Sequence, residues 1–184
     1  MHIIGITGTI GAGKGTVVDY LKLKGFQHYS ARSLLLAELT KRGLENDRNA
    51  MRPLANELRQ TYGPAYIAET LFQEAETAGG HAVIESLRTV GEIEALKRLS
   101  SSFVLLAVDA HPKIRHERVI KRGSETDDVS FEEFIEQELL ESEGKDAWAQ
   151  NLPACIEQAH VVITNDGPLE DLHKAVDEVL EKLG

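Results

Sequence analysis

The chain has 184 residues, of which 42% are apolar and 27% charged, and this composition suits a single globular domain with its own core. Its formal net charge of −10 argues against general binding to nucleic acids or anionic membranes, because both need a basic face. The single cysteine excludes an intrachain disulfide; with no basic leader and no membrane-length apolar run, we expect a cytoplasmic protein.

Short β-branched or apolar runs predict strands, and the amphipathic segments between them predict helices. The predicted strands are 2–7, 26–30, 81–86, 102–110 and 160–164, and we expect the most apolar of them, 102–110, at the centre of the sheet. The predicted helices are 16–23, 31–42, 47–62, 65–78, 90–99, 112–122, 131–142 and 168–183. Strands that alternate with helices predict a parallel sheet with helices on both faces.

Several side chains support these boundaries. Ser30 is placed to cap the helix that follows it, and Ser130 with Glu133 matches the capping-box pattern. Pro53 is expected to break or kink its helix early, and the polar residues 123–130 predict a loop. The stretch "LPACIEQA" has the pattern of an apolar helix face, so we expect a structural role for Cys155.

The stretch "GTIGAGK", from Gly8 to Lys14, has the spacing of a phosphate-binding loop and lies between a predicted strand and a predicted helix. Successive backbone N–H groups in such a loop form an anion-binding nest, and the helix N-terminus adds partial positive charge. Lys14 would reach the β- and γ-phosphates. The pattern usually continues with a Mg²⁺-binding hydroxyl, but here Gly15 follows and Thr16 comes one position late. The predicted nucleotide contacts are Gly8, Gly11, Ala12, Gly13, Lys14, Gly15 and Thr16.

This G-K-G-T variant resembles the loop of adenylate kinase and its nucleoside-monophosphate kinase relatives. In that family magnesium is held by nucleotide oxygens and water, with no direct ligand from the protein. The resemblance covers most of the chain and implies ATP and Mg²⁺ as cofactors. It also implies one three-layer P-loop kinase domain over 1–184, with a five-stranded parallel sheet in the order 2-3-1-4-5.

The stretch "VIESLRT", from Val83 to Thr89, resembles the family's strand that ends in an acidic residue and is followed by an arginine. The resemblance implies that Glu85 orients the water around magnesium and that Arg88 binds the acceptor's phosphate. This chain has one residue fewer between the two than adenylate kinases have. The alternatives are a surface carboxylate at a strand end and a solvated arginine.

The stretch "DAHPKIRHERVIKRGSETDD", from 109 to 128, resembles the family's segment that leads into a lid, here about 115–145. Arg115, Arg118 and Arg122 are spaced i, i+3 and i+7, so they lie on one helix face. Phosphoryl transfer needs positive charge around the moving group, and we favour Arg118 and Arg122 for this role. The alternative is a charged outer face paired with neighbouring acids.

The lid is short, which resembles dephospho-coenzyme A kinases and archaeal-type adenylate-kinase-related proteins. The stretches "ELRQTYGPAYIAETL" (57–71) and "AHVVITNDGPLEDL" (159–172) resemble the second group, and the later one also resembles the end of dephospho-coenzyme A kinases. In that family the "TNDG" loop, here 164–167, packs beside adenine, which makes Asn165 a nucleotide contact. The alternative is an ordinary turn, which Asn, Asp and Gly favour.

The acceptor is expected between the second and third strands, at about 30–80, where Arg32 and Arg59 are the candidate phosphate ligands beside Arg88. Arg48 and Arg52 lie in the same region, and any of these arginines could instead face water. The histidines lack metal-ligand spacing and are expected at structural positions. Dephospho-coenzyme A kinases carry acidic residues just after the second strand, where this chain has "YSAR". A monophosphate acceptor needs no base, so the absence of these acids favours a nucleotide.

The sequence therefore predicts a kinase that transfers the γ-phosphoryl group of Mg-ATP to a small molecule, most simply a nucleoside or deoxynucleoside monophosphate. Lys14, Glu85, Arg118 and Arg122 are the predicted catalytic residues. One alternative is a dephospho-coenzyme A kinase. Another, of a different class, is a nucleotide-binding regulatory ATPase without a small acceptor.

Overall fold

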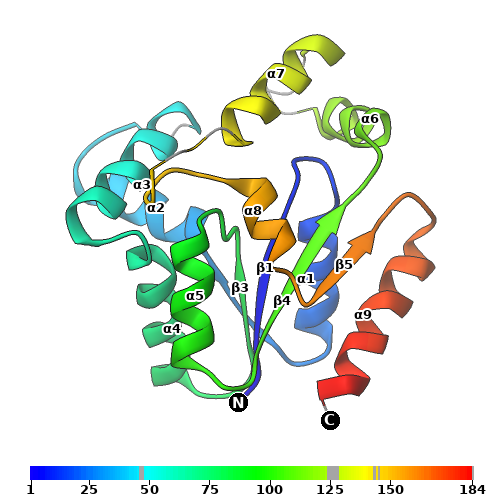
Figure 1. Cartoon of the computed structure of the whole chain (residues 1–184), viewed down its shortest axis with the longest axis horizontal. Helices are drawn as coiled ribbons and strands as arrows, with labels where there is room; N and C mark the ends of the chain where they lie inside the picture. The colour runs from blue at the N-terminus through cyan, green and yellow to red at the C-terminus, as the bar shows by residue number, and fades with distance from the viewer. Residues whose placement is uncertain (46–47, 124–128, 143, 145, 184) are drawn as a thin grey trace.

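The computed structural model describes residues 1–45, 48–123, 129–142, 144 and 146–183. Five parallel strands form one sheet in the order β2-β3-β1-β4-β5, which confirms the predicted order (Figure 1). Their bounds are β1 Ile3–Gly8, β2 Gln27–Ser30, β3 Ala82–Glu85, β4 Phe103–Asp109 and β5 Val161–Thr164. β4 is an interior strand as expected, but the central position belongs to β1.

Helices cover both faces of this sheet, as Figure 1 shows. Their bounds are α1 Lys14–Leu23, α2 Ala31–Lys41, α3 Arg48–Tyr62, α4 Tyr66–Ala78, α5 Val90–Leu99, α6 Pro112–Arg122, α7 Phe131–Ser142, α8 Leu152–Glu157 and α9 Leu169–Leu183. One core lies between the sheet and α1 with α9, and the other lies between the sheet and α2 to α5 with α8. No helix in the described part of the chain has the length and apolar character needed to cross a membrane.

Successive side chains of a strand point to opposite faces of the sheet, so each interior strand contributes residues to both cores. In β1, Ile3 packs into the core under α2 to α5, whereas Ile4 and Ile6 pack into the core under α1 and α9. Because both faces are buried, β1 and β4 are apolar along nearly their whole length and do not alternate with polar residues; Thr7 and Asp109 are the exceptions. The apolar runs of the sequence therefore became the interior strands.

Local signals for the helix ends are largely confirmed. Ser30 caps α2 by accepting a bond from the Ser33 N–H, and Ser130 and Glu133 form the expected capping box of α7. The expected break at Pro53 is wrong, because α3 continues through this residue; the expected kink stays a prediction. A proline costs a helix one backbone hydrogen bond, and here the packing of α3 outweighs that loss, since Met51, Leu54, Ala55 and Leu58 are all buried. Residues 124–128 of the predicted loop lie outside the described part of the chain.

The parallel arrangement brings five strand ends to one edge of the sheet. The loop after β1, Glu85 at the end of β3, Asp109 at the end of β4 and Thr164 at the end of β5 all lie there. Figure 1 shows α6 and α7 beyond this edge. Ligands of open α/β sheets bind at the carboxyl ends of the strands, so the functional site is to be sought at this edge.

Candidate functional site

The loop between β1 and α1 adopts a conformation that its glycines make possible. Gly11 has φ 76° and Gly13, which is the N-cap of α1, has φ 101°, both in the left-handed region. A Cβ atom at Gly11 would lie 2.5 Å from the carbonyl oxygen of Arg115, and one at Gly13 would overlap the side-chain amide of Asn165. Only glycine fits these two positions, and the loop ends at the positive N-terminus of α1.

Lys14 is folded against the inner side of this loop. Its Nζ donates to the carbonyl oxygens of Gly8 at 2.8 Å and Thr9 at 2.7 Å. The predicted nucleotide contacts from Gly8 to Thr16 thus share one turn and the first turn of α1. A Cβ atom at Gly15 would meet no atom within 4 Å, so the position that commonly carries a hydroxyl is open here.

Side chains from other elements hold the outer side of the loop. Arg115 Nη1 donates to the Ile10 carbonyl at 3.3 Å, and Asn165 Nδ2 donates to the Ala12 carbonyl at 2.8 Å. The Thr9 hydroxyl donates to Asp109 Oδ1 at 2.6 Å. The structure therefore gives Asn165 a contact with the loop backbone; the predicted contact with adenine stays a prediction.

Glu85 lies at the end of β3 among cationic groups. His28 Nε2, from the neighbouring strand β2, lies 3.0 Å from Glu85 Oε2. This hydrogen bond, helped by the charges of Lys14 and Arg88, holds the pKa of Glu85 below its usual range despite partial burial. The carboxylate is consequently ionised at neutral pH.

Sequence reasoning missed the role of His28. The contact between His28 and Glu85 can be predicted only when the strand order is known. β2 pairs with β3, with His28 opposite Val83 and Ser30 opposite Glu85. Side chains two residues apart on a strand share a face, so His28 and Glu85 lie on the same side of the sheet. Without the strand order, the two residues are separated by 57 positions and nothing links them.

The three arginines of α6 do not share one environment. Arg118 is half-buried, and its Nη1 is buried without a hydrogen-bond partner among the described residues. Arg122 lies exposed in the last turn of α6. Arg115, considered with them as a phosphate-binding residue, is only 4% exposed and forms an ion pair with Glu138. Arg115, which was not favoured for charge neutralisation, is thus engaged within the protein, and the roles of Arg118 and Arg122 stay predictions.

The arginines that were predicted to bind the acceptor also lie in different environments. Arg59 is buried, with Nε 3.0 Å and Nη2 2.7 Å from Glu92 Oε1, so its charge is already neutralised inside the protein. In this structure Arg59 ties α3 to α5, while its Nη1 is buried without a hydrogen-bond partner among the described residues. The predicted contact of Arg59 with the acceptor stays a prediction. Arg32 is exposed at the start of α2 and Arg88 is half-buried before α5. Arg52 is exposed on α3, and the side chain of Arg48 lies outside the described residues.

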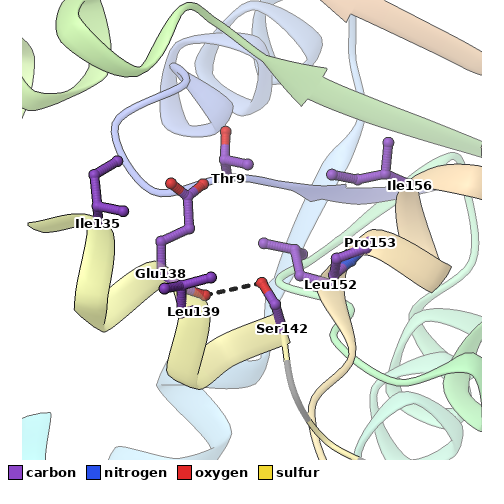
Figure 2. Close-up of a pocket in the computed structure, with 8 residues that line it drawn as sticks. All are labelled: Thr9, Ile135, Glu138, Leu139, Ser142, Leu152, Pro153 and Ile156. Atoms are coloured by element: carbon purple, nitrogen blue, oxygen red, sulfur yellow. Dashed lines mark hydrogen bonds between the residues drawn. The ribbon is translucent and has the colours of Figure 1, made fainter.

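A cavity of about 200 Å³ lies beside the phosphate loop, between α7 and α8 (Figure 2). Thr9, Glu138 and Ser142 provide its polar groups, and its remaining wall is apolar: Ile135, Leu139, Leu152, Pro153 and Ile156. Figure 2 shows the Glu138 carboxylate turned toward Thr9. The cavity thus connects the loop to both helices that follow α6.

Cys155 lies fully buried in α8, and burial raises the pKa of its thiol to about 12, with the nearby carboxylate of Glu92 adding to this effect. We expect the native protein at pH 8 to react with a disulfide reagent such as DTNB far more slowly than the unfolded chain. In urea, one thiol per chain should react at once. Rapid reaction of the native protein, at a rate above that of local unfolding, would contradict the structural role.

Comparison with known proteins agrees with this architecture. The model of a family described as AAA domain matches residues 4–141. A UPF0200 protein of Staphylothermus marinus is 27% identical over 183 residues, covering 100% of this chain and 93% of that protein. A UPF0200 protein of Pyrobaculum aerophilum is 28% identical over 184 residues, covering 100% and 99%.

Solved structures share the fold. TT1252 from Thermus thermophilus superimposes with a TM-score of 0.67 at 25% identity, covering 100% of this chain and 98% of that one. Shikimate kinase from Bacteroides thetaiotaomicron gives 0.56 at 18% identity, covering 98% of each chain, and dephospho-CoA kinase from Campylobacter jejuni gives 0.55 at 14%, covering 100% and 97%. The last two likenesses establish the P-loop kinase fold.

Proposed function

Since the chain belongs to the AAA domain family and has the P-loop kinase fold, we propose that it is an ATP-dependent phosphotransferase acting on a small acceptor, a nucleoside or deoxynucleoside monophosphate. The observation that carries this proposal is the joint placement of an anion-binding loop, Lys14 and an ionised Glu85 at the carboxyl edge of one sheet. Phosphoryl transfer is catalysed chiefly by positioning and by neutralising charge, and this edge offers both.

The loop and its surroundings fit a triphosphate with magnesium. The backbone N–H groups from Gly11 to Gly15 would hold the phosphates, and Lys14 would leave its carbonyl partners to reach the β- and γ-phosphates. Magnesium, when bound, supplies positive charge that offsets the charge on the phosphate oxygens. The open space at Gly15 and the ionised Glu85 suit an ion held by nucleotide oxygens and water.

Arg118 and Arg122 would neutralise the transferring group. In support, Arg118 Nη1 is buried without a hydrogen-bond partner among the described residues, a costly state that a phosphoryl oxygen would relieve. Both arginines lie one helical turn apart on α6, beyond the sheet edge where the phosphates would bind. Arg115 is excluded from this role because its donors are already engaged.

Arg88, together with Arg32, would bind the acceptor's phosphate. Arg88 stands three residues after Glu85, and its charge helps to lower the pKa of that carboxylate. An ionised phosphate acceptor needs no proton removed, which makes positive charge sufficient. With Arg59 committed to Glu92, these two arginines are the remaining candidates from the original acceptor set.

One observation favours a second candidate, in which the acceptor is an alcohol, as in dephospho-coenzyme A. The His28 imidazole, 28% exposed and bonded to Glu85, is a carboxylate-oriented base, the kind of group that removes a hydroxyl proton. Dephospho-coenzyme A kinases carry acidic residues just after the second strand, and this chain lacks them. In this second candidate His28, within β2, would act as the base instead.

The test is a coupled ADP-release assay with Mg-ATP against a panel of nucleoside and deoxynucleoside monophosphates and dephospho-coenzyme A. We expect turnover to require a monophosphate and the variant His28→Gln to lower kcat less than tenfold, as no base is needed. Turnover only with dephospho-coenzyme A, together with a loss in H28Q on the order of 10²–10⁴-fold, would establish the second candidate. ATP hydrolysis unaffected by any acceptor would indicate a regulatory ATPase instead.

A further inference from the structure

We infer that Arg115 is a positioning residue that joins the phosphate loop to helix α7, so that a nucleotide bound on the loop also stabilises α7. The inference rests on the proposed function, since it takes the loop to bind a nucleotide. It assigns Arg115 a role different from that of Arg118 and Arg122, although all three project from α6. Arg115 is buried, and its guanidinium contacts three separate segments of the protein.

Arg115 uses its donors on its own loop, on the phosphate loop and on α7. Nε donates to the Ala110 carbonyl at 2.8 Å, and Nη1 donates to the Ile10 carbonyl at 3.3 Å. Nη1 and Nη2 lie 2.7 Å and 3.0 Å from the two carboxylate oxygens of Glu138, which makes a bidentate fork. At 4% exposure, none of these contacts is readily replaced by water.

The contact with Ile10 affects the direction of a loop N–H group. In a trans peptide the carbonyl and the following N–H point in opposite directions. Holding the Ile10 carbonyl outward, on Arg115, therefore turns the Gly11 N–H toward the inner side of the loop, where phosphates would bind. Asn165 acts in the same way on the Ala12 carbonyl: it holds this carbonyl outward and so directs the Gly13 N–H inward. Arg115 differs from Asn165 because its other end reaches α7.

The same guanidinium contacts helix α7, which also packs against His116 of α6 through Phe131 and Phe134. Glu138 belongs to α7, and the ring of Phe134, one turn earlier, lies 5.5 Å from the Arg115 guanidinium carbon. Phe134 is fully buried, whereas Leu139 on the same helix is exposed. A phosphate that fixes the Gly11 N–H thereby fixes the Ile10 carbonyl, Arg115 and Glu138 in turn. The coupling is reciprocal, so loss of the α7 end must also weaken nucleotide binding.

The test is hydrogen–deuterium exchange of the full chain, with and without AMP-PNP and magnesium, beside calorimetric measurement of AMP-PNP affinity. In the wild type we expect the analogue to slow exchange in both α1 and α7. In Arg115→Gln, protection of α1 should persist while protection of α7 is lost, and affinity should fall about tenfold, the size expected for one lost charge-assisted hydrogen bond. Arg115→Lys keeps the cation without the fork and should retain part of the α7 response.

Two further variants separate coupling from simple packing. Glu138 belongs to α7 and pairs with Arg115, and we expect Glu138→Gln also to weaken AMP-PNP binding several-fold. Lys113→Gln removes an exposed cation from α6 and should behave as wild type. Melting temperatures confirm that each variant is folded at the temperature of the experiment.

The outcomes distinguish the inference from the proposed function. If wild-type protein binds no AMP-PNP, the nucleotide site itself is refuted, and the inference with it. If the wild type binds the analogue but α7 shows no protection, or if R115K, R115Q and E138Q all bind and protect like the wild type, the inference alone is overturned. An α7 that exchanges faster in every variant, but equally with and without the analogue, would assign Arg115 to packing only and would also refute it.

Discussion

Lys14→Ala is expected to lower kcat/KM for ATP by on the order of 10²–10³-fold, the range measured when one donor aimed at developing charge is removed from an enzyme. Lys14 is the cation carried by the phosphate loop itself, and its Nζ lies within 2.8 Å of two loop carbonyls. Its removal takes away both a ligand of the transferring phosphate and a brace across the loop. We therefore expect a loss in ATP affinity as well as in kcat.

The measurement is steady-state ADP release, with AMP-PNP affinity determined in parallel by calorimetry. Lys22→Ala is the matched control, because Lys22 lies on the same helix, is exposed, and among the described residues pairs only with Asp19, at 3.5 Å. This control should keep wild-type kinetics. Full activity in K14A would refute the assignment of the loop as the nucleotide site, since no other residue on the loop could supply the charge.

Arg59→Met is expected to lower the free energy of unfolding by about 3–5 kcal/mol, as happens when one partner of a buried ion pair is removed. The side chains of Arg59 and Glu92 are 2% and 1% exposed, so the substitution leaves a carboxylate without its cationic partner in the interior. Glu92→Leu should cost at least as much. Glu92 also accepts from the N–H groups of Arg88 and Thr89 and closes the capping box of α5, which supports the turn that carries Arg88.

Urea unfolding followed by circular dichroism and by the fluorescence of Trp148, the only tryptophan, provides the free energies. Arg42→Met is the control, because Arg42 pairs with Glu38 and Glu57 at the surface, where ion pairs contribute little. If R59M were no less stable than R42M, the pair with Glu92 would not be structural. The proposal that Arg59 binds the acceptor would then have to be reconsidered.

The contrast between Arg59 and Arg88 bears on how the acceptor would be held. Both arginines were candidate acceptor ligands in the sequence, but the Glu92 carboxylate binds the side chain of Arg59 and the backbone N–H of Arg88. Glu92 thus withdraws the charge of Arg59 from the acceptor region while positioning the turn of Arg88.

Much of the architecture was already determined by the sequence, because it depends on information within a few residues. The glycines at 8, 11 and 13 permit the turn of the phosphate loop, and the apolar runs specify interior strands whatever surrounds them. Ser30, Ser130 and Glu133 act on N–H groups three residues away, so their capping roles were readable too. The resemblance of the loop to nucleoside-monophosphate kinases then supplied the strand order, which local patterns do not contain.

Only the tertiary structure decided which polar side chains are committed to the protein itself. Helical spacing predicts that Arg115, Arg118 and Arg122 point in similar directions from α6, but it does not predict which groups they meet. Arg115 meets Glu138 and the Ile10 carbonyl. His28 acquires its partner because β2 lies beside β3, and Asn165 reaches the phosphate loop across 153 residues. These pairings depend on which segments meet in space, and a charge is available to a ligand only where no such partner has already neutralised it.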